Sequence, residues 1–100
     1  MSGKVDSDRI LYVSSERNSV EIHMVDGDKI TTYGKLDDAE EQLKSNFVRC
    51  HKSYLVNLRY IVKYTATYFV LMNGETVPIS RSKKTESADK YVLFKGALVK

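Results

Sequence analysis

Two short stretches of the sequence hold the residue types that contact nucleic acids. The first, Phe47 to Asn57, reads Phe-Val-Arg-Cys-His-Lys-Ser-Tyr-Leu-Val-Asn, and the second, Pro78 to Lys84, reads Pro-Ile-Ser-Arg-Ser-Lys-Lys. Arg and Lys neutralise phosphates, and an Arg can also bind a guanine edge through two hydrogen bonds. In both stretches such cations stand among hydrogen-bonding and β-prone residues. The two stretches therefore indicate a surface that binds DNA.

The charge of the chain is divided unevenly along its length. The formal net charge is +3, but residues 1–45 hold 6 Lys/Arg against 10 Asp/Glu, whereas residues 46–100 hold 10 against 3. The first part therefore carries −4 and the second +7. Such an imbalance favours a surface that meets a polyanion, and the alternative is a solvated basic face without a partner.

Length and composition are those of one small folded domain. The 100 residues are 42% hydrophobic and 29% charged, which suits one compact domain with one core. There is no signal-peptide run and no apolar stretch long enough to cross a membrane. The single cysteine, Cys50, cannot form an internal disulfide, so we expect a reducing, cytoplasmic setting without membrane contact. Cys50 alternates with apolar Val48, which predicts a buried strand residue rather than a reactive thiol.

The hydrophobic pattern predicts that most of the chain is β-sheet. Turn signals at Asp26-Gly27-Asp28 and at Asn73-Gly74 each join two strands, and Pro78 suggests a strand at a sheet edge. The β-prone runs cover residues 10–13, 20–25, 29–33, 47–51, 54–58, 60–72, with a break near 65–67, and 76–79.

Two segments have helical spacing instead. They predict short helices over about 36–44 and 82–95, the second capped by Ser82 and ended by Gly96. Residues 1–8 are polar and are expected to be a leader or a linker remnant, with residues 9–100 forming the domain.

The sequence gives little support for catalysis. His23, His51 and Cys50 lack the spacing of a metal site, and neither a phosphate-binding Gly-rich loop nor a nucleophile elbow is present. We expect His23 to be an ordinary strand residue. The carboxylates of the first helix are expected to form a solvated acidic face, favoured by the helix dipole, rather than an acid–base pair. We therefore expect no enzyme, no metal and no cofactor.

Four strings of residues, in order along the chain, carry a family resemblance. They are Tyr33-Gly-Lys-Leu36 before the first helix, Phe47 to Asn57, Asn73-Gly-Glu75, and Pro78-Ile-Ser-Arg81. By these strings the chain, from about Arg9 to about Phe94, resembles the LytTR DNA-binding domain family. The resemblance implies an elongated all-β arrangement of small antiparallel sheets with short helices, usually the output half of a bacterial response regulator. It also implies that loops, rather than a recognition helix, enter the DNA grooves.

The resemblance also implies which residues contact DNA. Asn18 and Ser19 match one loop that contacts bases in the major groove, and Arg81 matches the other. Lys52 matches the element that approaches the intervening minor groove. The residues expected to contact phosphates, which fix register without reading sequence, are Arg17, Arg49, His51, Ser53, Ser80, Ser82, Lys83 and Lys84. Tyr54, Leu55 and Val56 are expected in the core, and Asn57 is expected to bond backbone in a turn.

The expected partner is double-stranded promoter DNA. The resemblance implies paired direct repeats and bent DNA, from which we expect two protomers per DNA site and a monomer in free solution. A receiver domain would accompany this domain in a longer chain. Two alternatives remain open at this point. One is a β-rich protein-interaction or sensory module whose basic half binds an acidic partner, and the other is a β-barrel that binds single-stranded nucleic acid by stacking bases on exposed aromatic rings.

Overall fold

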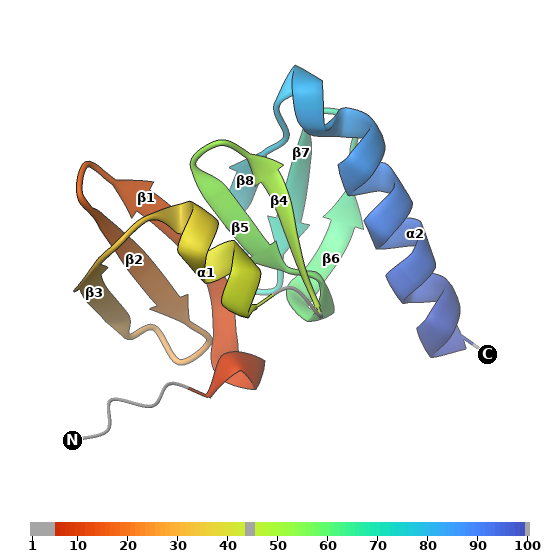
Figure 1. The fold of residues 1–100 in the computed structure, drawn as a ribbon. Coiled ribbons are helices and arrows are strands. Elements are labelled where there is room, and N and C mark those ends of the chain that lie inside the picture. Colours follow the sequence, from red (N-terminus) through yellow and green to blue (C-terminus); the bar gives the residue numbers. More distant parts are fainter. Residues whose placement is uncertain (1–5, 44–45, 100) are drawn as a thin grey trace.

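The computed structural model describes residues 6–43 and 46–99, which form two antiparallel sheets and two α-helices (Figure 1). The larger sheet has five strands in the order β3-β2-β1-β5-β4, and the smaller has three in the order β6-β7-β8. The strands are β1 (Ile10–Glu16), β2 (Ser19–Met24), β3 (Lys29–Tyr33), β4 (Phe47–His51), β5 (Tyr54–Asn57), β6 (Ile61–Tyr64), β7 (Tyr68–Leu71) and β8 (Thr76–Pro78). The helices are α1 (Leu36–Gln42) and α2 (Lys84–Val99), with 3₁₀ turns at Ser7–Arg9, Leu58–Tyr60 and Arg81–Lys83. The expected mostly-β fold is confirmed, and the molecule is longer in one direction, at 39 × 28 × 24 Å.

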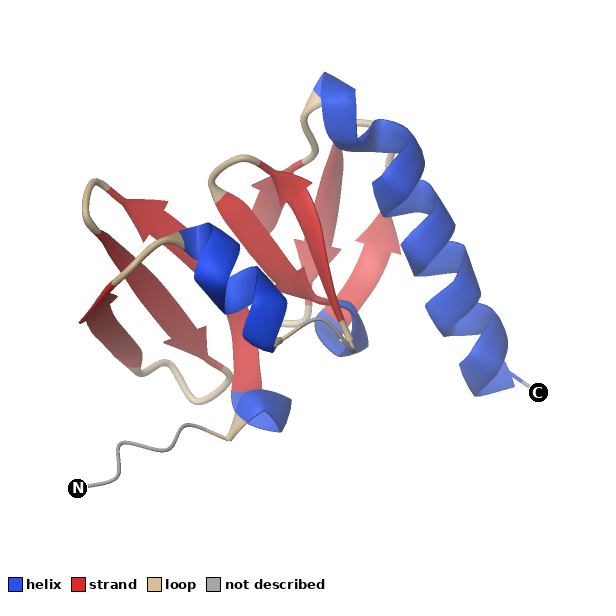
Figure 2. Cartoon of the chain, in the orientation of Figure 1, coloured by secondary structure: helices blue, strands red, loops and turns tan. Residues whose placement is uncertain are grey.

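The middle of the larger sheet is buried on both faces, which explains why its strands are so apolar. Successive strand residues point to opposite faces. Leu55 therefore packs in the cluster beneath α1, and the next residue, Val56, packs in the cluster that faces the smaller sheet. In β1, Val13 packs in the cluster beneath α1, and Tyr12 packs in the cluster that faces the smaller sheet. The larger sheet is thus the central layer, with α1 on one face and the smaller sheet on the other (Figure 2).

The first helix was predicted in the right place. Leu36 is buried, and Ala39 and Leu43 pack against the same cluster, so the apolar spacing of three and four marks the buried face as expected. The helix covers Leu36–Gln42, and residue 44, the end of the predicted helix, lies outside the described residues. Much of the expected leader, residues 1–5, also lies outside them, whereas Ser7–Arg9 form a 3₁₀ turn.

The C-terminal helix differs from its prediction at both ends. Ser82 does not cap it, because Ser82 lies inside the 3₁₀ turn that precedes α2. Gly96 does not end it, because the helix continues to Val99. A glycine costs a helix about 1 kcal/mol and does not by itself end one. Packing supports the helix up to Lys95, whose Nζ donates to the Ile61 carbonyl at 3.2 Å.

Gly96→Ala is therefore expected to stabilise the domain. The added Cβ meets no atom within 4 Å, and the residue has no positive φ, so the substitution removes unfolded-chain entropy without strain. We expect the free energy of unfolding to rise by about 0.5–1 kcal/mol, measured by urea denaturation. Gly74→Ala is the matched control: its Cβ also meets nothing, but its φ of +91° is strained for alanine, so it should destabilise. Equal effects of both substitutions would contradict this account.

Three other expectations for single residues are confirmed. Cys50 is fully buried, its Sγ lies 3.4 Å from the Pro78 carbonyl oxygen, and burial raises the pKa of its thiol to about 12. Pro78 lies in β8, an edge strand. The side chain of Asn57 donates to the Ile10 carbonyl at 2.9 Å and accepts from the Arg59 amide at 3.0 Å. In the described part of the chain, no helix is long and apolar enough to cross a membrane.

Candidate nucleic-acid interface

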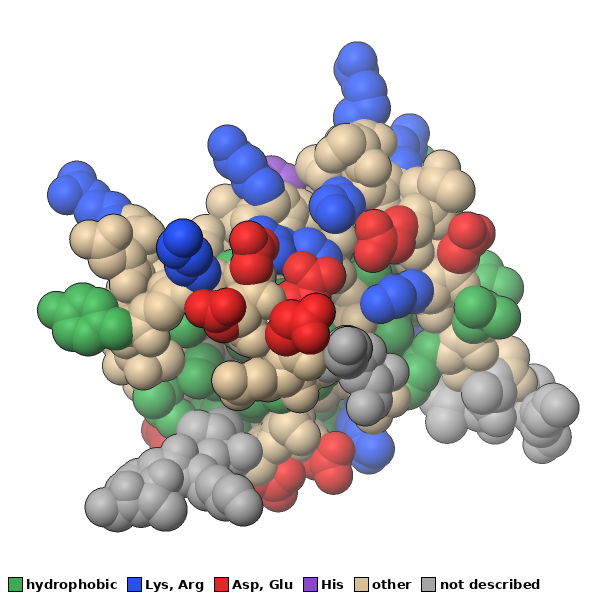
Figure 3. Space-filling model, in the orientation of Figure 1, with side chains coloured by type: hydrophobic (Ala, Val, Ile, Leu, Met, Phe, Trp, Pro, Cys, Tyr) green, Lys and Arg blue, Asp and Glu red, His purple; other side chains and the backbone are tan. Residues whose placement is uncertain are grey.

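The predicted contact residues lie in three segments that meet along one edge of the molecule. The segments are the β1–β2 turn at 17–19, the β4–β5 turn at 51–53, and residues 80–84 at the start of α2, and together we call them the basic edge. In Figure 1 all three lie at the top of the view. Figure 3 shows Lys and Arg side chains projecting along that edge, while Asp and Glu side chains gather below it over α1.

Backbone hydrogen bonds hold the three segments together. The Ser15 amide, at the end of β1, donates to the Ser53 carbonyl at 3.0 Å. The Ser80 amide donates to the Cys50 carbonyl at 2.8 Å, which attaches the start of the third segment to β4. The β4–β5 turn therefore lies between the other two segments and is bonded near both of them. Sequence positions more than 60 residues apart are brought to one edge in this way.

The first segment is a tight turn with one strained residue. Arg17 has a φ of +28°, which is uncommon outside glycine. The carbonyl of Asn18 accepts from the Gly34 amide at 3.2 Å, so the turn is also tied to the end of β3. Arg17 and Asn18 are exposed and Ser19 is partly exposed. Their side chains can therefore reach a ligand outside the protein.

The second segment presents a lysine and a histidine. Lys52 is exposed at the tip of the turn. The Ser53 amide donates to His51 Nδ1 at 3.1 Å, so a neutral His51 ring must carry its proton on Nε2. Nε2–H remains able to donate to a phosphate oxygen. The ring also lies edge-on to Tyr54, with the centroids 5.4 Å apart, which fixes its orientation.

The third segment combines an exposed arginine with two lysines. Arg81 is exposed, and none of the described residues forms an ion pair with its guanidinium. Ser80 and Ser82 hydroxyls lie 3.5 Å apart, and the Lys83 Nζ lies 3.7 Å from a Glu86 carboxylate oxygen. Lys84 is exposed at the first position of α2, where its charge adds to the positive end of the helix dipole. This segment can offer several donors to an anion.

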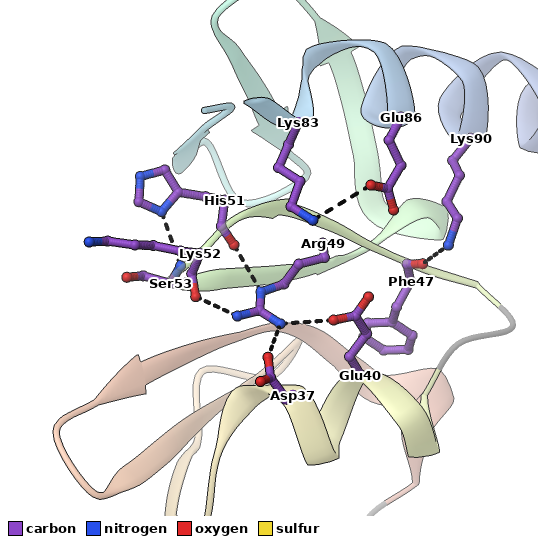
Figure 4. Close-up of polar contacts among 10 residues, drawn as sticks. All are labelled: Asp37, Glu40, Phe47, Arg49, His51, Lys52, Ser53, Lys83, Glu86 and Lys90. Atoms are coloured by element: carbon purple, nitrogen blue, oxygen red, sulfur yellow. Dashed lines mark hydrogen bonds and ion pairs between the residues drawn. The ribbon is translucent and has the colours of Figure 1, made fainter. Parts of the chain in front are cut away.

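Arg49 is a predicted contact residue whose side chain is mostly buried, with 11% exposed. Its guanidinium donates to the carboxylates of Asp37 and Glu40 and to the carbonyls of His51 and Lys52 (Figure 4). In the same view the His51 ring and the Lys52 side chain point away from the guanidinium. The Arg49 guanidinium is therefore bonded within the protein, whereas Lys52 on the adjoining turn is exposed.

Two carboxylates of α1 are more than the solvated acidic face that the sequence predicts. Asp37 and Glu40 lie one helical turn apart and both accept from Arg49 Nη1, at 2.9 and 2.8 Å. The hydrogen bond from Arg49, with its charge, lowers the pKa of the Asp37 carboxyl. The sequence gives no sign of this cluster, because it joins a helix to a strand that follows it in the chain.

Lys35 is a cation at the basic edge that sequence analysis missed. With Arg17 and Lys52 it lines a hollow of about 280 Å³ between the first two segments. The β2–β3 hairpin predicted from the sequence could have indicated Lys35. This hairpin returns the chain to the edge where β2 begins, with Ser19 opposite Tyr33 in the register. Lys35 follows two residues later and adds its charge to those of Arg17 and Lys52, while Arg49 and Asp37 also line the hollow.

His23 lies away from this edge and is a satisfied strand residue, as expected. Its ring stacks on Tyr12 with the centroids 4.1 Å apart, and its Nε2 lies 3.0 Å from the Ser14 hydroxyl. Burial lowers the pKa of His23, and it raises the pKa of Tyr12 to about 12 together with the nearby Glu75 carboxylate. No group of His, Cys, Asp and Glu suited to a metal ion occurs among residues 6–43 and 46–99.

Comparison with known proteins gives the same family as the four residue strings of the sequence analysis. A profile described as LytTr DNA-binding domain matches residues 2–91. The sensory transduction protein LytT of Oceanobacillus iheyensis is 31% identical over 86 residues, covering 78% of this chain and 35% of that protein. LytT of Bacillus subtilis is 32% identical over 88 residues, covering 82% of this chain and 36% of that protein. The chain therefore spans about a third of the length of these relatives.

A solved structure has the same fold. It is the LytTr DNA-binding domain of a protein from Bacillus cereus described as a methyl-accepting/DNA response regulator. The two structures agree with a TM-score of 0.75 at 26% sequence identity, over 88% of this chain and 84% of the other. Together with the profile match over most of the sequence, this establishes the relationship. The chain belongs to the LytTr DNA-binding domain family, a family of DNA-binding domains and not of enzymes.

Proposed function

We propose that this domain binds double-stranded DNA sequence-specifically, with the three segments of the basic edge entering the grooves. The observation that carries the proposal is the meeting of these segments at one edge with exposed cations in each: Arg17, Lys52, and Arg81 with Lys84. Arg81 and Asn18–Ser19 are assigned to bases in the major groove, and Lys52 to the minor groove between them. The residues assigned to phosphates are Arg17, His51, Ser53, Ser80, Ser82, Lys83 and Lys84.

We further propose that the domain is the output part of a bacterial transcriptional regulator of the response-regulator type. Its kinship with LytT proteins, of which it spans about a third, supports this role. A receiver domain would then lie elsewhere in the longer chain, and the domain would act in the cytoplasm. Two protomers are expected to occupy paired direct repeats, whereas the free domain is expected to be a monomer. A tight dimer in free solution, measured by light scattering without DNA, would contradict the last point.

The first test is a binding selection on randomised duplex DNA at about 50 and 200 mM salt. We expect enrichment of a repeated motif, with an affinity that falls steeply as salt rises, because neutralised phosphates release counterions. Competition with single strands separates this function from a base-stacking module. Tyr33, the most exposed of the exposed large hydrophobic residues at 89%, stands alone at its end of β3 and makes no stacking platform with another ring among the described residues. If no duplex is enriched, a protein-interaction module with an acidic partner becomes the better account.

Lys84→Ala is expected to weaken binding to all duplexes alike. Lys84 supplies one exposed charge at the start of α2, and a phosphate contact carries no sequence information. The slope of log affinity against log salt should fall in magnitude by about 1. The measurement is a fluorescence-anisotropy titration at four salt concentrations on selected and random duplexes. A change of base preference with an unchanged slope would show that Lys84 contacts bases instead.

A further inference from the structure

Arg49 has its hydrogen-bonding capacity almost filled by the protein itself. A guanidinium has five N–H donors. Arg49 Nε donates to the His51 carbonyl at 2.9 Å and Nη2 donates to the Lys52 carbonyl at 2.6 Å. Nη1 donates to Asp37 at 2.9 Å and to Glu40 at 2.8 Å. Four of the five donors are therefore engaged, and little of the group remains for an outside ligand.

The two carboxylates bonded to Arg49 also disfavour a DNA phosphate at this guanidinium, although the cations Arg17, Lys35 and Lys52 line the same hollow. One guanidinium faces two carboxylates, so this cluster carries a net negative charge. A phosphate approaching it would meet that charge and would have to displace existing charge-assisted hydrogen bonds, which are the stronger kind. The side chain is also only 11% exposed. Arg49 differs in this from Lys52, which is exposed on the β4–β5 turn.

The bonds of Arg49 end on the turn that carries Lys52. The β4–β5 pairing is irregular between Arg49 and His51, so the usual ladder does not fix the chain there. Arg49 fixes the carbonyls of two successive residues instead, His51 and Lys52. Asp37 and Glu40 hold the guanidinium from the other side, on α1. A turn fixed in this way loses less conformational entropy when it binds.

We propose that Arg49 is a positioning residue, anchored by Asp37 and Glu40, that holds the β4–β5 turn in the conformation in which Lys52 meets DNA. It acts through Lys52 and does not itself contact a phosphate. The inference rests on the proposed function and changes one role within it, since the sequence assigns Arg49 to a phosphate. The anchor on α1 makes an acidic helix, which lies beside the basic edge, part of the DNA-binding apparatus.

The anchoring carboxylates offer a matched pair of double variants. Asp37→Asn with Glu40→Gln removes two negative charges but keeps an oxygen acceptor at each position, whereas Asp37→Ala with Glu40→Ala removes the same charges and the acceptors. Loss of charge alone should strengthen binding to every duplex in both variants. We expect the ratio of selected-duplex to random-duplex affinity to be kept in the amide variant and to fall about fivefold in the alanine variant. Equal ratios in the two variants would overturn the proposal.

A double-mutant cycle tests whether Arg49 acts through Lys52. Arg49→Lys keeps the charge but cannot reproduce the planar fork. We expect it to weaken binding to the selected duplex about tenfold with an unchanged salt slope, and to have less than about a twofold effect when Lys52→Ala is already present. A tenfold loss that persists in the Lys52→Ala background would show that Arg49 acts independently of Lys52 and would overturn the proposal.

A measurement without DNA keeps this inference distinct from the proposed function. The Ser53 amide, bonded to His51 Nδ1, reports on the turn. Its hydrogen exchange should accelerate in the alanine variant and stay close to wild type in the amide variant, while core amides such as that of Val13 are unchanged. Unaltered exchange would overturn the positioning role even if the wild type binds DNA specifically. A wild type without DNA preference would overturn the proposed function, while the exchange result would still decide whether Arg49 holds the turn.

Discussion

Arg81→Ala is expected to remove the domain's preference at one base pair of its binding site. An exposed guanidinium can bond guanine O6 and N7 together, and this discriminates against a wrong base by about 1–3 kcal/mol. Arg81 has the required freedom, because it is exposed and pairs with no carboxylate among the described residues. Its backbone is fixed, since its carbonyl accepts from the Lys84 amide and the preceding Ser80 is bonded to β4. A side chain with a fixed backbone and an unpaired guanidinium is suited to contact the edge of a nucleobase.

The measurement compares affinities for the selected duplex, for single-base variants of it and for random duplex. Arg81→Ala should lower the affinity for the selected site by about 10- to 100-fold and leave one position without preference. Arg81→Lys is the matched control, because it keeps the charge without the two-pronged donor. It should bind random duplex as the wild type does and still lose the preference. Equal losses on selected and random duplex for Arg81→Ala would assign Arg81 to phosphate instead.

Phe69→Ala is expected to cause a large loss of stability. Phe69 lies in the middle strand of the smaller sheet with none of its surface exposed. Its ring packs against Tyr64 and Tyr91, with centroids 5.7 and 5.9 Å away, so it joins the smaller sheet to α2. Truncation of a buried Phe leaves a cavity and costs about 3–5 kcal/mol. This is a substantial part of the 5–15 kcal/mol that stabilises a typical domain.

The loss should appear in urea or thermal unfolding as a lower midpoint. Leu93→Ala is the control, because Leu93 is a large apolar residue of α2 that is 74% exposed, and its truncation should change the free energy of unfolding by less than about 0.5 kcal/mol. A cost below about 1 kcal/mol for Phe69→Ala would mean that the packing between α2 and the smaller sheet is loose. Binding measurements on the Phe69→Ala variant should be made well below its midpoint.

The local features of the fold could be predicted from the sequence, because they depend on neighbouring residues. Apolar residue type placed Leu55 and Val56 in the core, turn chemistry placed the hairpins at Gly27 and Gly74, and helical spacing identified the buried face of α1. The end of α2 was predicted wrongly at Gly96, because contacts of the preceding turn with β6 stabilise the helix beyond the point where local propensity would end it. Local signals cannot report such contacts.

The candidate site was predictable in part for the same reason. The residue types of 47–57 and 78–84 predicted these stretches as binding elements, and the family resemblance predicted the 17–19 turn and the roles of all three segments. The role of Arg49 could not be predicted in this way. Its partners Asp37 and Glu40 lie 12 and 9 residues earlier, on α1, and local patterns do not show that α1 packs beside β4. The sequence shows that carboxylates lie on α1 but not which side of the sheet the helix covers. A cation that is exposed and a cation that is paired look alike in a sequence.

The two segments assigned to the major groove are carried by different layers of the molecule. The β1–β2 turn belongs to the larger sheet, whereas residues 80–84 follow the last strand of the smaller sheet. Buried residues such as Val56 and Val77 fill the space between these layers. Under the proposed function, this core sets the number of base pairs that separates the two major-groove contacts. Changes of side-chain volume in this core should alter the tolerated operator spacing while every residue that touches DNA stays the same, so that related domains can diverge in site length through their interiors.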